Sequence, residues 1–165
     1  MLSLDSPRWA DLRQAYGGAE DVPRLITALS TVDAPAPRAE LWFALWRMLC
    51  HASEVFEAAY AAVPHLLLLS DEHPLGERVQ ALHLATRVEL LRRVPTSPPM
   101  PPDLVIAYGE SIESLPARVA QCTTAPWDIE MAQLLAAALL VGKRQPGLAR
   151  AVLDIGDDDE RPADA

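Results

Sequence analysis

Residues 38–51 read RAELWFALWRMLCH. Leu41, Leu45 and Met48 recur at the spacing that places side chains on one face of an α-helix. A second apolar stripe runs beside the first and consists of Trp42, Trp46 and Leu49. An apolar arc this wide predicts a helix that other elements cover on more than one side.

The flanking segments continue the helical periodicity, and none shows the alternation of a β-strand. Turn signals such as the glycine pair at 17–18 and the prolines at 35 and 37 separate them. The fold is therefore expected to be all-α, with about seven to nine helices packed as antiparallel pairs and no sheet. The further candidate helices cover residues 6–16, 21–32, 54–69, 75–94, 104–122, 126–141 and 146–155.

A short motif recurs along the chain. Residues 22–26 (VPRLI) return 41 residues later as residues 63–67 (VPHLL), and residues 115–119 (LPARV) are a looser third copy. An offset near 40 residues is typical of two-helix HEAT-type repeats. We therefore expect a HEAT-like α-solenoid in which the three prolines start or kink helices at corresponding positions.

Length and composition indicate one domain. The chain has 165 residues, of which 50% are hydrophobic and 22% charged, as in globular proteins. We expect a single helical-repeat domain over residues 1–155, with a proline-rich connector at 95–102 inside it. The last twelve residues hold six acids against one arginine. Residues 156–165 are therefore predicted to be a disordered acidic tail.

Charge and hydropathy exclude two classes of partner. The formal net charge of −9 argues against binding to a nucleic-acid backbone. Apolar stretches fall short of the roughly 18 to 20 residues that span a membrane. The first residues lack a secretory signal pattern. We expect a soluble cytoplasmic protein that contacts no membrane.

The sequence shows no pattern that points to catalysis. Four histidines and two cysteines lack metal-binding spacings, and no Gly-rich phosphate loop or nucleophile elbow is present. Cys50 and His51 are neighbours on an expected helix and point about 100° apart, which does not suit a nucleophile and its base. We expect no catalytic residue, cofactor or metal.

Carboxylates outside the expected core are candidates for a protein interface, with one tryptophan as an anchor beside them. Acidic groups on the concave face of a solenoid attract a basic protein. The alternative is that the carboxylates form ordinary solvated faces and the tryptophan belongs to the core. The candidate interface residues are Glu54, Glu57, Asp71, Glu72, Glu110, Glu113 and Trp42.

Part of the chain resembles a known group of proteins. Residues 9–12 (WADL), 15–17 (AYG) and 21–23 (DVP) resemble the opening of a group of bacterial HEAT-repeat proteins. Residues 45–66 are similar to that group's second helix pair, which has leucines, a histidine, a polar turn and an Ala-Ala-Val-Pro block. Where the group has Gln-Gly after the histidine, this chain has Ala-Ser at 52–53.

The resemblance covers roughly residues 9–69 and implies a function. Such proteins are found beside secreted toxins in polymorphic toxin systems, and some are thought to act as immunity proteins. It implies a non-catalytic module that binds and occludes a cognate toxin, with a basic toxin domain as its partner. The alternatives are a HEAT-like scaffold or adaptor subunit with no toxin partner, and a HEAT-like lyase or glycosylase.

Overall fold

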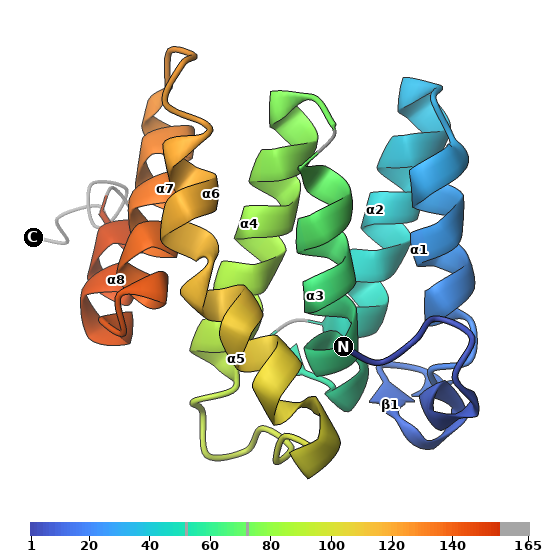
Figure 1. Ribbon diagram of the computed structural model, residues 1–165. Coiled ribbons are helices and arrows are strands. Elements are labelled where there is room, and N and C mark those ends of the chain that lie inside the picture. The colour runs from blue at the N-terminus through green and yellow to red at the C-terminus, as the bar shows by residue number, and fades with distance from the viewer. Residues whose placement is uncertain (52, 72, 156–165) are drawn as a thin grey trace, which may run out of the picture.

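The computed structural model describes residues 1–51, 53–71 and 73–155. Helices dominate this part of the chain, which confirms the predicted predominance of helix (Figure 1). Two 3-10 helices, η1 (Pro7–Asp11) and η2 (Pro102–Leu104), accompany eight α-helices in the described residues. These are α1 (Val22–Thr31), α2 (Pro35–Leu49), α3 (Glu57–Ser70), α4 (Leu75–Leu91), α5 (Val105–Glu113), α6 (Leu115–Ala120), α7 (Ile129–Gly142) and α8 (Pro146–Leu153).

The helices stand side by side in the order of the sequence. In Figure 1, α1 and α2 form one hairpin, α3 and α4 form the next, and α7 and α8 lie at the far end. Helix α3 packs against α1, α4 and α5, and α4 packs in turn against α7. Because these helices enclose α3, ten of its fourteen residues are buried.

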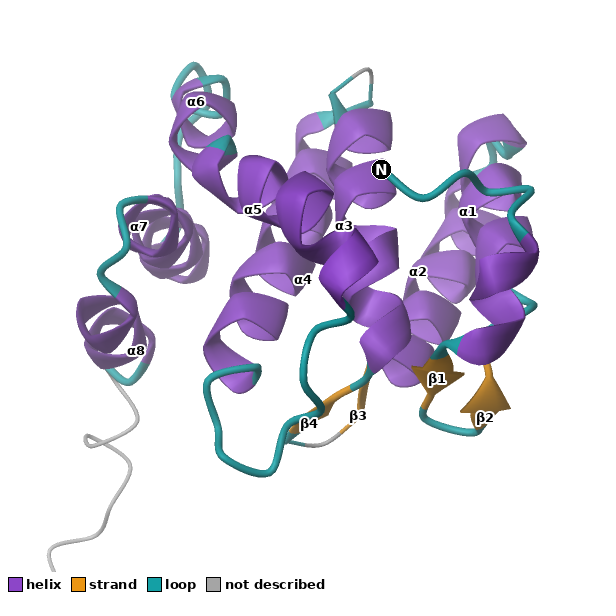
Figure 2. Cartoon of the chain, turned by 60° about the horizontal axis from the view of Figure 1, so that its bottom comes forward, coloured by secondary structure: helices purple, strands orange, loops and turns teal. Residues whose placement is uncertain are grey.

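The expectation that the chain has no sheet is wrong. Among the described residues, β1 (Arg13–Gln14) pairs antiparallel with β2 (Gly17–Gly18), and β3 (Cys50–His51) pairs antiparallel with β4 (Glu54–Val55). Figure 2 shows both hairpins at the same end of the helices. Each replaces part of a helix that periodicity had predicted, since a two-residue strand is too short to show alternation.

The first hairpin depends on its glycine. Residues 6–16 do not form one α-helix, because η1 ends at Asp11 and Leu12 is extended, with φ −87° and ψ 145°. Gly17 then adopts a φ of +144°, which side chains of L-amino acids rarely allow. Gly17 thus permits the hairpin, whereas the sequence pattern had indicated only that a helix ends there.

Prolines start helices here more often than they end them. Helix α2 begins at Pro35, inside a stretch predicted to be a turn. Proline is tolerated there because the N–H groups of a first helical turn have no intrahelical partner, so the N–H that proline lacks is not missed. Pro23 and Pro116 are the second residues of α1 and α6, as predicted. Pro64 is instead the eighth residue of α3, where one backbone hydrogen bond of the helix cannot form. The expectation that the three prolines occupy corresponding positions in their helices is therefore wrong for Pro64.

Some contacts join elements that are distant in sequence. His65 Nε2 lies 2.7 Å from the carbonyl of Leu2, which fastens the N-terminal segment to α3. Within that segment the indole Nε1 of Trp9 donates to the carbonyl of Ser3 at 2.9 Å. Helix α7 meets α6 at Gly142, where an added Cβ would lie 2.4 Å from Cδ of Pro116. A side chain at this glycine would push the two helices apart.

The proline-rich connector leads from α4 to η2. Ser97 donates from its hydroxyl to the carbonyl of Leu91 at 2.7 Å, and the phenol of Tyr60 donates to the carbonyl of Pro98 at 3.1 Å. These bonds hold the connector against α3 and α4. Within the described part of the chain, no helix has both the length and the apolar character needed to cross a membrane.

Candidate functional site

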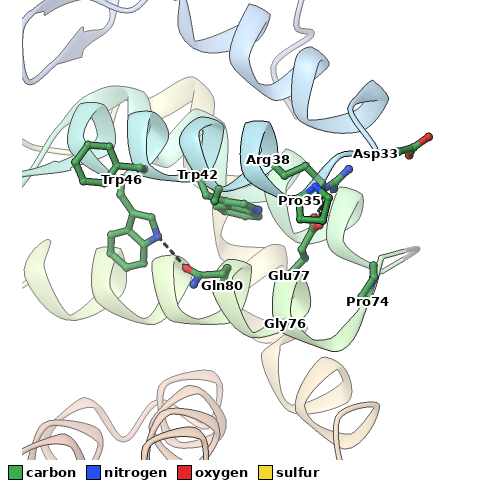
Figure 3. A pocket seen from close by; sticks show the side chains of 11 residues that line it. Asp33, Pro35, Arg38, Trp42, Trp46, Pro74, Gly76, Glu77 and Gln80 are labelled. Atoms are coloured by element: carbon green, nitrogen blue, oxygen red, sulfur yellow. Dashed lines mark hydrogen bonds and ion pairs between the residues drawn. The ribbon is translucent and has the colours of Figure 1, made fainter.

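A groove of about 630 Å³ opens between α2 and α4. Figure 3 shows the indoles of Trp42 and Trp46 reaching from α2 toward α4, with the Arg38 and Glu77 side chains at the same end as Pro35 and Pro74. The walls of this groove are mostly apolar. The described residues that line it are Asp33, Pro35, Arg38, Ala39, Trp42, Phe43, Trp46, Pro74, Gly76, Glu77 and Gln80.

Three aromatic residues of α2 form one wall of the groove. Trp42 and Trp46 are four residues apart and therefore share a face of the helix. Trp46 donates from Nε1 to Oε1 of Gln80 at 3.2 Å, and its ring meets that of His83 edge-to-face at 4.7 Å. Phe43, one residue further around the helix than Trp42, is 64% exposed. The guanidinium of Arg47 lies 5.6 Å from the centre of the Phe43 ring. The wall thus combines two recessed indoles with an exposed phenyl ring.

The indole of Trp42 carries an unused hydrogen-bond donor. Trp42 is only 6% exposed, and within the described chain its Nε1 has no hydrogen-bond partner. In Figure 3 this nitrogen is on the side of the ring that faces Arg38 and Glu77. A buried N–H without an acceptor costs free energy, and an acceptor brought by a bound molecule would remove that cost.

A buried ion pair closes one end of the groove. Arg38 donates through Nε and Nη2 to both carboxylate oxygens of Glu77, and through Nη1 to the carbonyl of Val32. The two side chains are 8% and 18% exposed. Since this bidentate contact joins the start of α2 to the first turn of α4, it fixes the spacing of the two helices at that end.

Two of the predicted interface residues, Glu54 and Glu57, line one pocket. This pocket, of about 700 Å³, lies between the β1–β2 hairpin, β4 and the connector, and Tyr16 also lines it. Glu57 accepts a hydrogen bond from the backbone N–H of Arg13 at 3.2 Å. Arg13 also lines the pocket, so its described charged residues carry a net charge of −1. Tyr16 is 58% exposed, and the guanidinium of Arg47 lies 5.6 Å from the centre of its ring.

The structure does not gather the other predicted interface residues there. Asp71 follows the last turn of α3, about 20 Å along the helix axis from Glu57 at its start. It forms an ion pair with Arg118. Glu113 forms an ion pair with Arg144. Glu110 lines a smaller pocket beside Pro64, and Glu72 lies outside the described residues. Trp42 lines the α2–α4 groove, whose described lining includes none of these acids.

Sequence reasoning missed Phe43, Arg38 and Glu77 as parts of the groove. Phe43 had a visible signal, because it lies outside both apolar stripes of residues 38–51 and therefore cannot face the same neighbours. The pairing of Arg38 with Glu77 had none, since the two residues are 39 positions apart.

Two histidines, His65 in α3 and His83 in α4, have lowered pKa values. Burial lowers the pKa of His65 below its usual 6.5, although the contact with the carbonyl of Leu2 opposes this. Burial also lowers the pKa of His83, and the charge of Arg87 adds to the effect. Both rings are therefore held in the neutral form at neutral pH.

Acidification should therefore destabilise the protein through His65 and His83. The unfolded chain takes up protons at the usual pKa near 6.5, whereas the folded chain takes them up only at lower pH, so stability falls as pH falls below about 6.5. Urea denaturation at pH 7.5 and 5.5 measures the change. His65→Gln combined with His83→Gln should reduce it, whereas the exposed control His51→Gln should not. An equal change in all three proteins would contradict the assignment.

The cysteines are poorly placed for chemistry. Burial raises the pKa of the Cys50 thiol to about 12 and also raises that of Cys122, so both remain protonated at neutral pH. In residues 1–51, 53–71 and 73–155, no three histidine, cysteine or acidic side chains gather as metal ligands do.

The α2–α4 groove is suited to binding. Arg38 and Glu77 are paired with each other, the walls are mostly apolar, and the exposed ring of Phe43 lies at the edge of the groove. These are the properties of a surface that takes up apolar side chains with a few directed hydrogen bonds. Comparison with models of protein families, with curated proteins and with solved structures finds no match to the chain.

Proposed function

We propose that the chain is a non-catalytic protein-binding module that docks a basic segment of its partner in the α2–α4 groove. The observation that carries the proposal is Phe43, 64% exposed at the edge of a groove in which Trp42 holds an unused donor. Recessed tryptophans and accessible aromatic rings supply much of the binding energy in protein interfaces. A backbone carbonyl of the partner would accept from Trp42 after a shift of the indole, because Nε1 is buried in the free protein.

Charge supports a basic partner. Arg38 neutralises Glu77, so Asp33 gives the described lining of the groove a net charge of −1. The chain as a whole carries −9. Acidic surfaces accelerate association with basic proteins and disfavour acidic ones.

The proposed arrangement of the helices is a HEAT-like α-solenoid. In support, α2 and α4 begin at Pro35 and Leu75, 40 residues apart, close to the offset of the recurring motif. Pro23 lies twelve residues before the start of α2, and Pro64 lies eleven residues before the start of α4. In a solenoid the second helices of successive pairs share one face. The groove would then belong to the face that such proteins use for binding.

Within this class, the proposed role is that of a cytoplasmic immunity protein that occludes a cognate bacterial toxin. The resemblance over residues 9–69 supports this role. The alternative is a HEAT-like scaffold or adaptor with no toxin partner. Co-expression with the product of the adjacent gene tests the choice, read out as a stoichiometric complex and as relief of toxicity. A complex without toxicity to relieve would favour the scaffold, and no complex would oppose both.

Reversing the charges of Glu54 and Glu57 should slow association with a basic partner. Lysine at both positions turns an attractive pocket repulsive, and the effect on the association rate should be about tenfold at low salt and smaller at high salt. Stopped-flow mixing at two salt concentrations measures it. The control Glu20→Lys with Glu130→Lys makes the same charge change on exposed residues outside this pocket.

Deletion of residues 156–165 should slow association less than the double reversal. These residues lie outside the part of the chain that the structure describes, and their composition predicts disorder. A segment of that kind would lose conformational entropy on binding and would offer no fixed shape. If the deletion abolishes binding and the reversals leave it intact, the attraction comes from the tail and the pocket has no part in it.

A further inference from the structure

A pocket of about 390 Å³ lies where the end of α4 meets α5 and the end of α7. It shares none of its described lining residues with the α2–α4 groove. Three arginines line it: Arg92 and Arg93 from the end of α4, and Arg144 from the residues that follow α7. Such a gathering of cations stands out in a chain with a net charge of −9.

Two of the guanidinium groups are held in place by one buried carboxylate. The side chain of Glu89 is 3% exposed, and Arg92 and Arg93 each donate to it through Nε and Nη2. The phenol of Tyr108 also donates to Glu89, at 3.0 Å, and the guanidinium of Arg92 lies 5.8 Å from the centre of the Tyr108 ring.

This arrangement leaves part of each guanidinium available. The group has five N–H donors in one plane. Because Nε and Nη2 of both arginines point at Glu89, their Nη1 groups are turned away from that carboxylate. Arg92 and Arg93 are 32% and 40% exposed, so solvent reaches them. The donors are therefore fixed in direction before any ligand arrives.

The third arginine has an uncommon backbone conformation. Arg144 has a φ of +60°, and within the described chain it is the single residue other than glycine with positive φ. Glycine or asparagine usually occupies such a position after a helix. Arg144 is 82% exposed and donates from Nη2 to Oε1 of Glu113 at 2.5 Å. An ion pair this exposed is weak, so the guanidinium can exchange Glu113 for another anion.

Helix α5 contributes a residue without a side chain, Gly109, to the wall of the pocket. This glycine lines the pocket, and a Cβ added to it would meet no atom of the described chain within 4 Å. Glycine inside a helix is unfavourable relative to alanine, so local helix stability does not explain it. Its absence of a side chain keeps the space beside the arginines open.

We infer that this pocket binds a phosphate group. Of the charged residues described at its wall, three arginines face two glutamates, which leaves a net charge of +1. Guanidinium groups pair with phosphate through parallel hydrogen bonds. A tetrahedral phosphate presents oxygens in several directions and can accept from Arg92, Arg93 and Arg144 together, whereas a carboxylate presents only two oxygens in one plane.

The test is a titration of the full chain with inorganic phosphate at constant ionic strength, followed by amide NMR shifts. Saturable shifts are expected at Gly109 and Gly142, with a dissociation constant of about 1 mM or less. Acetate in the same titration should produce much smaller shifts. Phosphate binding no stronger than acetate binding would overturn the choice of ligand.

Two matched pairs of variants locate the site. Arg144→Ala should weaken phosphate binding about fivefold, whereas Lys143→Ala, which loses the same charge next to the pocket, should not. Glu113→Gln should strengthen binding because it removes the competing carboxylate, whereas Glu110→Gln on the same helix should not. Equal responses within both pairs would show a general effect of surface charge and overturn the proposal.

Gly109→Leu is the blocking variant. Its side chain should fill the open space, so phosphate shifts should disappear while the circular dichroism spectrum and the melting temperature are retained. Unchanged binding in a folded Gly109→Leu protein would exclude this pocket as the site.

Discussion

Replacing Glu77 with alanine should lower the free energy of unfolding by about 3 kcal/mol. The substitution leaves the guanidinium of Arg38 at 8% exposure with no carboxylate to compensate its charge. Arg38 has already lost its hydration in the folded protein, which costs free energy. Its hydrogen bond to the carbonyl of Val32 compensates only part of that cost. Urea denaturation followed by circular dichroism measures the loss.

Two controls separate the buried pair from ion pairs in general. Arg24→Ala removes an exposed pair with Asp21, whose side chains are 85% and 73% exposed, and should cost less than about 0.5 kcal/mol. Arg38→Met combined with Glu77→Met should recover most of the stability, because apolar side chains then fill the space without unpaired charge. If Glu77→Ala costs no more than Arg24→Ala, the pair does not clamp α2 to α4.

Replacing Phe43 with alanine should weaken binding of the protein partner by about 2 kcal/mol, or roughly 30-fold in the dissociation constant. The phenyl ring is 64% exposed in the free protein, so its removal should hardly change stability while it deletes the accessible aromatic of the groove. Isothermal titration calorimetry gives the affinity, and the melting temperature shows whether the fold is retained.

Ile106→Ala is the matched control for Phe43→Ala. Ile106 is an apolar residue of α5 with 75% exposure, and it is not part of the groove wall. Its truncation should leave the affinity within twofold. If the two variants bind equally well, the partner docks elsewhere, and the pocket of Glu54 and Glu57 becomes the site to test.

The sequence predicted the helices better than the turns between them, for a physical reason. Apolar periodicity is local, so the broad stripe of residues 38–51 was enough to predict a covered helix. Besides Gly17, the β1–β2 hairpin depends on remote atoms: the N–H of Ala15 donates to the carbonyl of Met48 at 3.0 Å, and the backbone N–H of Arg13 donates to Glu57. Spacing along the chain carries no trace of such contacts.

The same limit applies to the candidate sites. Trp42 was singled out from its place in a stripe, and Glu54 and Glu57 lie close together because they are three residues apart. The ion pair of Asp71 with Arg118 bridges 47 positions, and that of Glu113 with Arg144 bridges 31. Both depend on how α5, α6 and α7 dock, which local patterns do not determine.

The contact at Gly142 also bears on how this chain can change by mutation. Helix α7 approaches Pro116 so closely that the space for a single methyl group is taken. Gly76 and Gly147 meet no described atom within 4 Å of an added Cβ, so a small side chain fits there. Mutational freedom is therefore unequal among glycines that look alike in the sequence. A larger residue at position 142 would require a simultaneous change in α6, which ties the evolution of these two helices together.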